Sequence, residues 1–412
     1  MWSVRRVGRV FFPLDEELAL LPSSFSPFIH QCIVRLGTLL PFEQVPEQVA
    51  ALLGVQVSRE TVRRLTEQAG AAQVAVEAEE LRQVPRHGMA PEPDGVMQQL
   101  SADGAMVPLL HGIWTEVRTL AIGIIEEQRG PEGSAVHARD VSYFSRLCRA
   151  EDFIDWAALP LQQRGTERAG TVVAVSDGAP WLQELITAHR PDAVRILDFP
   201  HAAGYLSQAA QAAFGVGSRE AAVWLDDWLP KLKRTTPEDV IEAIQALPAP
   251  TPEAVEIQRR VLAYLRARRA QLRYAHFQQV GYPIGSGMVE SGNKLVVEAR
   301  LKGAGMHWQR GSINPMLALR GVLCSGRWDD AWARIWQELA RQVRERRRAG
   351  RARRQAERDT GTSSDRETPT SPAKRLPPEP TRSIAGRPTD DHWWKQGYSQ
   401  RLLARALARA TS

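Results

Sequence analysis

The stretch Thr171–Leu206, TVVAVSDGAPWLQELITAHRPDAVRILDFPHAAGYL, holds two short apolar runs, each followed by a segment of helical character. TVVAVS is rich in β-branched residues and ends at an acid and a glycine, which is typical of a buried strand and its turn. WLQELITAH predicts a helix, AVRILDF predicts a second strand, and HAAGYL predicts the start of another helix. This order of elements is typical of an α/β fold.

Three β-like runs precede this stretch, namely VMQQLSADG, VRTLAIGIIEE and AVHARDVSYF. Short turns separate them, so they are consistent with an antiparallel meander. A helical segment, FSRLCRAEDFIDWAALPLQQR, then leads into Thr171. Three strands, a helix and then strand–helix–strand–helix predict an α/β fold with a mixed sheet.

The composition is that of an ordinary globular protein. The chain has 412 residues, of which 43% are hydrophobic and 24% charged, with a net charge of +6. That length allows two to four domains. Its start, MWSVRRVGRVFF, lacks an apolar signal region, and no run of about eighteen apolar residues occurs. We therefore expect a cytoplasmic protein without a membrane partner.

Much of the basic charge lies in one segment, RQVRERRRAGRARR, which holds eight arginines and one acid. Such runs are often solvated helix ends, but one so one-sided favours nucleic acid, which would associate the protein with the nucleoid. Beyond Arg354 the composition turns to Ser, Thr, Pro and charge, so residues 341–412 are predicted to form a basic and disordered tail. Three scattered cysteines predict neither a disulfide framework nor a cysteine-built zinc site.

Residues 46–93 predict a helix-turn-helix followed by a linker. One helix can begin at Pro46 and break at Gly54, and Ser58 is a good N-cap for a second. The second helix would expose basic side chains suited to DNA: Arg59, Arg63 and Arg64. A helical hairpin without a DNA role would give the same pattern.

The remaining segments complete the predicted organisation. Residues 202–280 are alanine- and glutamine-rich and are predicted to form a helical insertion, with tryptophans at 224 and 228. The insertion would divide an α/β core into a first part and a second part that carries a further acid. The full division is 1–45 lead-in, 46–93 helix-turn-helix and linker, 94–201 core, 202–280 insertion, 281–340 core and 341–412 tail.

Three acids could carry chemistry: Asp103, Asp177 and Glu290. The first two are each followed by glycine and are predicted to close apolar strands, and Glu290 lies beyond the helical block. Carboxylates that converge at strand ends suit Mg²⁺ or Mn²⁺, which can activate a water or hydroxyl towards a phosphodiester. Asp-Gly is also a common turn dipeptide without any catalytic role.

Asp198 and His201 form a second pair at a predicted strand-to-helix junction. Their spacing can bring the carboxylate close to the imidazole. Equally, Asp198 can simply cap the helix that follows it. Nothing nearby supplies the further ligands that zinc would need.

Four motifs resemble prokaryotic DDE transposases of the Kra insertion-sequence type, which are mutator-like: SADGAMVP, VVAVSDGAPW, ILDFPHAAGYL and GSGMVESGNKLVVEARLKGAGMHW. The resemblance covers about Phe11 to Trp336, and the long glycine-rich motif is its most specific part. It implies a ribonuclease H-like catalytic domain. One departure is the stretch SVRRVGRVFF, which stands where such proteins often carry a Cys-x-x-Cys knuckle, so we expect no zinc module here.

The resemblance also implies roles for individual residues. Asp103, Asp177 and Glu290 look like the three catalytic, metal-binding acids, and Asp198 and His201 look like the family's C/D-x-x-H element. In relatives a tryptophan of the insertion can support DNA, so Trp224 and Trp228 are candidates, although core packing is the more common role for either alone. In a transposase, Lys294, Arg300 and Lys302 would contact phosphates beside the cut.

We therefore expect a transposase that binds the terminal inverted repeats of its own element, cleaves with Mg²⁺ or Mn²⁺, and joins the 3′-hydroxyl to target double-stranded DNA. Pairing two ends implies a homodimer or higher assembly on DNA. Two alternatives remain: a sequence-specific DNA-binding regulator, and a ribonuclease H-like nuclease that cuts but never joins strands.

Overall fold

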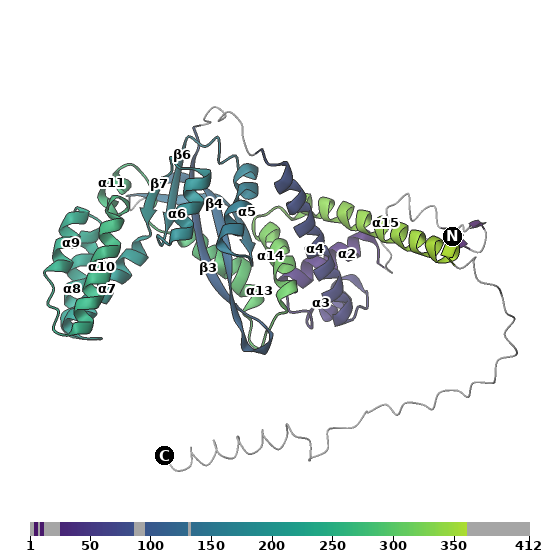
Figure 1. Cartoon of the computed structure of the whole chain (residues 1–412), viewed down its shortest axis with the longest axis horizontal. Helices are drawn as coiled ribbons and strands as arrows, with labels where there is room; N and C mark the ends of the chain where they lie inside the picture. The colour runs from purple at the N-terminus through teal and green to yellow at the C-terminus, as the bar shows by residue number, and fades with distance from the viewer. Residues whose placement is uncertain (1–3, 7–8, 12–24, 86–94, 131–132, 361–412) are drawn as a thin grey trace, which may run out of the picture. The chain divides into compact units, whose positions relative to one another are not determined.

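The computed structural model describes residues 4–6, 9–11, 25–85, 95–130 and 133–360 (Figure 1). The predicted tail beyond 360, much of the lead-in and most of the predicted linker lie outside these residues. Contacts divide the chain into two units, Met1–Gly350 and Arg351–Ser412. At the N-terminus, β1 (Val4–Arg6) pairs with β2 (Arg9–Phe11) as an antiparallel ribbon.

A five-stranded mixed sheet is the centre of the first unit. Its strands are β3 (Met97–Pro108), β4 (Trp114–Gly130), β5 (Gly133–Arg146), β6 (Thr171–Ser176) and β7 (Val194–Leu197). The spatial order is β5-β4-β3-β6-β7. The first three strands are antiparallel neighbours, whereas β6 and β7 run parallel to β3. The predicted α/β fold with a mixed sheet is therefore confirmed.

Helices cover both faces of this sheet because its parallel strands are apolar on both faces. In β6, Val172 and Ala174 pack with Phe153 of α5 (Ala150–Gln163) and Leu185 of α6 (Pro180–His189). The alternate residues Val173 and Val175 pack with helices on the other face. Helix α6 is the crossover that joins the parallel strands β6 and β7.

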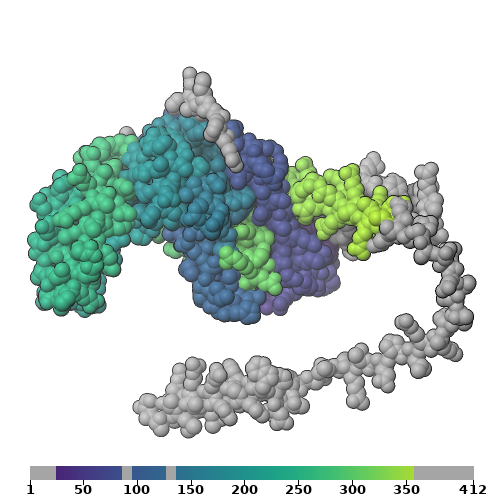
Figure 2. All heavy atoms as spheres, viewed as in Figure 1, coloured from purple at the N-terminus to yellow at the C-terminus, as the bar shows by residue number. Residues whose placement is uncertain are grey.

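Residues 199–279 are almost wholly helical. The segments are α7 (Phe199–Phe214), α8 (Arg219–Leu232), α9 (Pro237–Gln245), α10 (Pro252–Ala267), η2 (Arg269–Leu272) and α11 (Tyr274–Gln279). Ser218, Thr236 and Thr251 cap α8, α9 and α10 by accepting backbone N–H bonds. Buried residues of α7, α9 and α10 share one core with β6 and β7, and Figure 2 shows these helices packed together. The block is thus attached to the edge of the sheet.

The N-terminal helices are α2 (Pro27–Leu39), α3 (Val45–Leu53) and α4 (Arg59–Gln83). Gly54 ends α3 with a φ of 66°, and the Ser58 side chain caps α4, so both predicted punctuation residues act as sequence reasoning expected. Helix α4 is 25 residues long, and its buried face packs on the C-terminal helices. Those are α14 (Arg310–Cys324) and α15 (Trp328–Thr360).

The arginine run differs from its prediction. Residues 341–360, assigned to a disordered tail from sequence, are helical and belong to α15. Arg341 forms ion pairs with Glu338 and Glu345 along the helix, which is one reason a segment so rich in charge can stay helical. In the part of the chain that the structure describes, no helix is both long and apolar enough to cross a membrane.

We expect Gly70→Ala to destabilise the protein by about 1–3 kcal/mol. A methyl group at Gly70 of α4 would lie 2.3 Å from the Pro315 carbonyl oxygen of α14, and backbone cannot move aside easily. The matched control is Gly204→Ala in α7, where a methyl group meets nothing within 4 Å. That variant should gain up to about 1 kcal/mol from helix propensity. Denaturant unfolding of both proteins measures the difference; equal stabilities would contradict the close helix packing.

Candidate active site

Asp103 and Asp177 lie on adjacent strands. The parallel pairing of β3 with β6 matches Leu100 with Ala174, and each acid follows three residues later in the chain, Asp103 within β3 and Asp177 just after β6. Asp177 directly follows the end of β6, as the sequence predicted. Asp103 does not close its strand, because β3 continues to Pro108 through antiparallel pairing with β4. The prediction that Asp103 ends its strand is therefore wrong, although Asp103 and Asp177 still lie at matching positions along the neighbouring chains of β3 and β6.

The Asp103 carboxylate is half-buried and held by two donors. Its Oδ1 accepts from the Gly104 N–H at 2.7 Å and its Oδ2 from the Asn293 side-chain amide at 2.9 Å. Burial raises the pKa of Asp103, the Gly104 N–H opposes this, and the negative charges of Asp177 and Glu290 raise it further. Glu290 is therefore electrostatically coupled to the strand acids.

The loop that carries Asp177 is fixed from two sides. Its Oδ1 accepts from the Ala179 N–H at 2.8 Å, which shapes the turn into α6. The Tyr264 hydroxyl of α10 donates to the Asp177 carbonyl, and Arg268, the residue after this helix, donates to the Gly178 carbonyl at 2.7 Å. Gly178 has a φ of 78° and a Cβ there would lie 2.5 Å from Arg268, so the helical block and this loop fit together only with glycine.

Glu290 stands on α12 (Gly287–Gly292), the first part of an interrupted helix. Met288 and Val289 bury this helix against Ala121 of the sheet, while the Glu290 side chain is exposed. Among the described residues, none forms a hydrogen bond or ion pair with its carboxylate. The carboxylate is thus available to a ligand.

Asn293 connects the Glu290 helix to Asp103. It begins η3 (Asn293–Glu298), a π-helical segment that continues into α13 (Ala299–Leu301). Its amide nitrogen donates to Asp103, and its buried Oδ1 has no partner in the described part of the chain. Segments of π-helix are frequent at functional sites. Sequence reasoning missed Asn293, although it lies three residues after Glu290 in the glycine-rich motif.

Asp198 and His201 do come together, and both readings of their spacing hold. Asp198 is fully buried and caps α7 by accepting the His201 N–H, while the His201 Nδ1 lies 2.9 Å from Asp198 Oδ2. Burial alone would raise the pKa of Asp198, but hydrogen bonds from His201 and from the Ser286 N–H outweigh it and hold the pKa below its usual value. The same hydrogen bond raises the pKa of His201, and the charges of Asp177 and Asp103 add to this.

The carboxylates of Asp103, Asp177 and Glu290 are chemically suited to bind a hard divalent cation. Three carboxylates supply oxygen ligands of the type that Mg²⁺ and Mn²⁺ take, and a cation would relieve the repulsion that raises the pKa of Asp103. Among the residues that the structure describes, no group of three or more His, Cys, Asp or Glu side chains is arranged to hold a metal ion.

The basic residues behind Glu290 differ in availability. Lys294 is exposed, and Lys302 forms an ion pair with Glu298 at 2.7 Å. Arg300 is only 2% exposed, donates to the Gly37 carbonyl at 3.2 Å and lies over the rings of Phe42 and Trp308. Its burial argues against the predicted phosphate contact and gives it a structural role, joining α2 to the end of the glycine-rich motif.

The other residues predicted to contact DNA also differ in exposure and in ion pairing. Arg59 and Arg64 of α4 are exposed, whereas Arg63 pairs with Glu60 and Glu67 of the same helix at 2.6 Å. Trp224 and Trp228 stack on α8 with ring centroids 5.8 Å apart, half-buried against the core of the helical block. They lie on a different element from the three acids.

No family model matches the chain, and no curated protein matches its sequence. The site residues themselves therefore carry the functional argument, with the resemblance of their motifs beside them.

We expect the pKa of His201 to lie above its ordinary value of 6.5 and to fall in Asp198→Asn, because the hydrogen bond and the negative charge of Asp198 favour the imidazolium. Stability from this pair is fully present below the unfolded pKa of His201 and is lost as pH rises through the raised folded value. Titration of the imidazole by NMR measures the shift.

The control for this titration is Asp192→Asn, which removes an exposed acid that pairs with Arg190. It should leave the His201 titration unchanged. An equal shift in both variants would mean that general charge, and not the Asp198 contact, sets the pKa of His201.

Proposed function

We propose that the chain is a DNA transposase with a ribonuclease H-like catalytic domain, acting on the terminal inverted repeats of its own mobile element. The observation that supports this is the relation of three acids from three motifs. Asp103 and Asp177 lie at matching positions of the neighbouring chains of β3 and β6, and Glu290 lies on the interrupted helix whose Asn293 donates to Asp103. The charges of Asp177 and Glu290 both raise the pKa of Asp103. The order β5-β4-β3-β6-β7, with its antiparallel first three strands, supports the ribonuclease H-like part.

Asp103, Asp177 and Glu290 would hold Mg²⁺ or Mn²⁺. When bound, these ions supply activation of a water or 3′-hydroxyl and stabilisation of the leaving oxygen at phosphorus. Asn293 orients the Asp103 carboxylate, and Tyr264 fixes the backbone at Asp177. His201 lies close enough to Asp103 and Asp177 for its positive charge to offset their repulsion.

DNA would be bound mainly through cations away from the acids. In the proposed helix-turn-helix, α3 and α4 present Arg59 and Arg64 at the exposed start of α4. The arginine-rich end of α15 would add affinity independent of sequence, and Lys294 would contact phosphate beside the cut. Such binding weakens steeply with salt. Pairing two element ends would take a homodimer or a larger assembly.

We expect Asp177→Asn to lose cleavage by at least about 100-fold while DNA binding persists. Asparagine keeps the Oδ1 that accepts the Ala179 N–H, so the turn should survive and only the charge is removed. Asp103→Asn and Glu290→Gln should behave alike. The substrates are duplexes from the DNA flanking the gene, tested with Mg²⁺ and Mn²⁺, and the control is the exposed acid variant Asp226→Asn.

The alternatives give different results in the same assays. Unchanged behaviour of all three acid variants, with sequence-specific binding intact, would favour a DNA-binding regulator. Cleavage that depends on the acids without joining of a labelled, pre-cut 3′ end would favour a nuclease.

We expect Gly287→Ala to fold normally but to lower cleavage by about tenfold, since an added methyl group that overpacks costs more than 1 kcal/mol. A Cβ at Gly287 meets nothing within 4 Å in the free protein, so any penalty must come from a bound molecule. The control is Gly311→Ala, whose Cβ is equally unobstructed. Full activity of Gly287→Ala would contradict passage of a DNA strand over the glycines before Glu290.

A further inference from the structure

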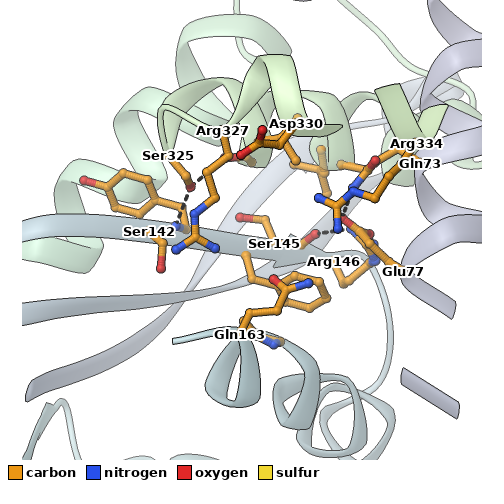
Figure 3. Close-up of a pocket in the computed structure, with 17 residues that line it drawn as sticks. Gln73, Glu77, Ser142, Ser145, Arg146, Gln163, Ser325, Arg327, Asp330 and Arg334 are labelled. Carbon is orange, nitrogen blue, oxygen red and sulfur yellow. Dashed lines mark hydrogen bonds and ion pairs between the residues drawn. The ribbon is translucent and has the colours of Figure 1, made fainter. Parts of the chain in front are cut away.

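A pocket of about 390 Å³ lies between the edge strand β5 and the helices α4, α5, α14 and α15 (Figure 3). None of the three acids of the candidate active site lines it. Three arginines do: Arg146 from β5, Arg327 from the turn before α15, and Arg334 from α15. The pocket is therefore a separate feature that joins the N-terminal and C-terminal helices to the sheet.

The three arginines differ in whether their positive charge is paired with an acid. Arg146 forms an ion pair with Glu77, and Arg334 pairs with Glu80 at 2.6 Å. Arg327 forms no ion pair with any residue that the structure describes, although its side chain is half-buried and extends towards β5 inside the pocket (Figure 3). It is the guanidinium in this cluster whose charge is left without a direct partner.

The surroundings of Arg327 disfavour its charge in the free protein. Burial lowers the pKa of Arg327, and the positive charges of Arg164 and Arg334 add to this effect, while the acids Asp140 and Asp330 oppose it. A bound anion would reverse the balance, because charge-assisted hydrogen bonds to a guanidinium are among the strongest in proteins. An anion in the pocket would therefore give the Arg327 guanidinium the direct charged partner that it lacks among the described residues, although the lining also includes the acids Glu77 and Asp330.

Two neighbouring arginines have hydrogen-bonding capacity to add. Arg146 is 2% exposed and its Nε has no partner in the described residues. The side chain of Arg334 is more exposed, but its Nε atom is buried and also has no partner there. Gln73, 3% exposed, has an unpartnered acceptor, its Oε1, which could accept a hydrogen bond from the P–OH of a singly protonated phosphate. Unmatched buried donors and acceptors are costly, so a ligand that satisfies them is favoured.

We propose that this pocket binds a phosphate group, with Arg327 as its main ligand and Arg146 and Arg334 as additional donors. The phosphate could be free, as inorganic phosphate or pyrophosphate, or could belong to a DNA backbone. Either would connect α4, β5 and α15, so its binding stabilises the folded chain by mass action. This site is independent of the proposed transposase activity.

The test is calorimetry and thermal unfolding of the full chain with pyrophosphate at constant ionic strength. The wild-type protein should bind and unfold at a higher temperature, and Arg327→Ala should lose at least about tenfold in affinity. Arg219→Ala, which removes an exposed arginine of α8, should bind as the wild type does. Arg327→Lys, which keeps the charge but not the planar fork, should fall between them and controls for a folding defect in the alanine variant.

A second arm identifies the source of the phosphate. If the phosphate is free, Arg327→Ala weakens pyrophosphate binding and leaves duplex binding unchanged. If it belongs to DNA, pyrophosphate competes with a duplex, and Arg327→Ala lowers the salt dependence of duplex binding by about one phosphate contact. Equal binding of both probes by Arg327→Ala and the wild type, or equal losses in Arg327→Ala and Arg219→Ala, would overturn the proposal.

Discussion

The buried carboxylate of Asp198 is the contact on which the candidate active site depends. It ends β7 and starts α7, and it also accepts the Ser286 N–H at 2.6 Å from a segment that returns after the whole helical block. The Phe199 N–H donates to the Ile284 carbonyl beside it, and Gln99 of β3 donates to the Gly285 carbonyl. These bonds hold the start of the Glu290 helix at the sheet.

This arrangement explains why an ionised group is kept in the core. Three donors stabilise the Asp198 charge, which compensates for its removal from water. A hydrophobic residue there could fill the space but could not fix the register of two segments at once. The half-exposed His201 completes the network: it pairs with Asp198 and also feels the negative charges of Asp177 and Asp103.

Local sequence patterns predict many of the helices and strands, but they do not predict features that depend on residues distant in the chain. The apolar run Thr171–Ser176 and the caps at Ser58 and Gly54 could be read directly, because strand burial and capping depend on neighbouring residues. The continuation of β3 past Asp103 could not be predicted in this way, because it depends on antiparallel pairing with β4. Arg300 shows the same limit: in sequence it resembles an exposed cation, and its burial depends on the distant Gly37 carbonyl and on the aromatic rings of Phe42 and Trp308.

The candidate site was accessible from sequence only as a set of acids. Asp103, Asp177 and Glu290 stand out by residue type and by motif, but Asn293 and Tyr264 act through contacts across 190 and 87 positions of the chain. Such side chains are ordinary in composition and are recognised only once their partners are known. Resemblance to a family identifies the acids, whereas the supporting residues come from the structure.

The π-helical segment η3 has a consequence for how this region can vary. Glu290, just before this segment, and Asn293, its first residue, both interact with Asp103, while Val296 and Val297 are fully buried in a separate core. A helix transmits rotation along its axis, so removing one residue between the two groups would turn one against the other by about 100°. The π-helical turn therefore fixes the direction in which Glu290 and Asn293 point relative to the buried Val296 and Val297. The length of this segment should consequently tolerate change far less than the identity of its exposed side chains.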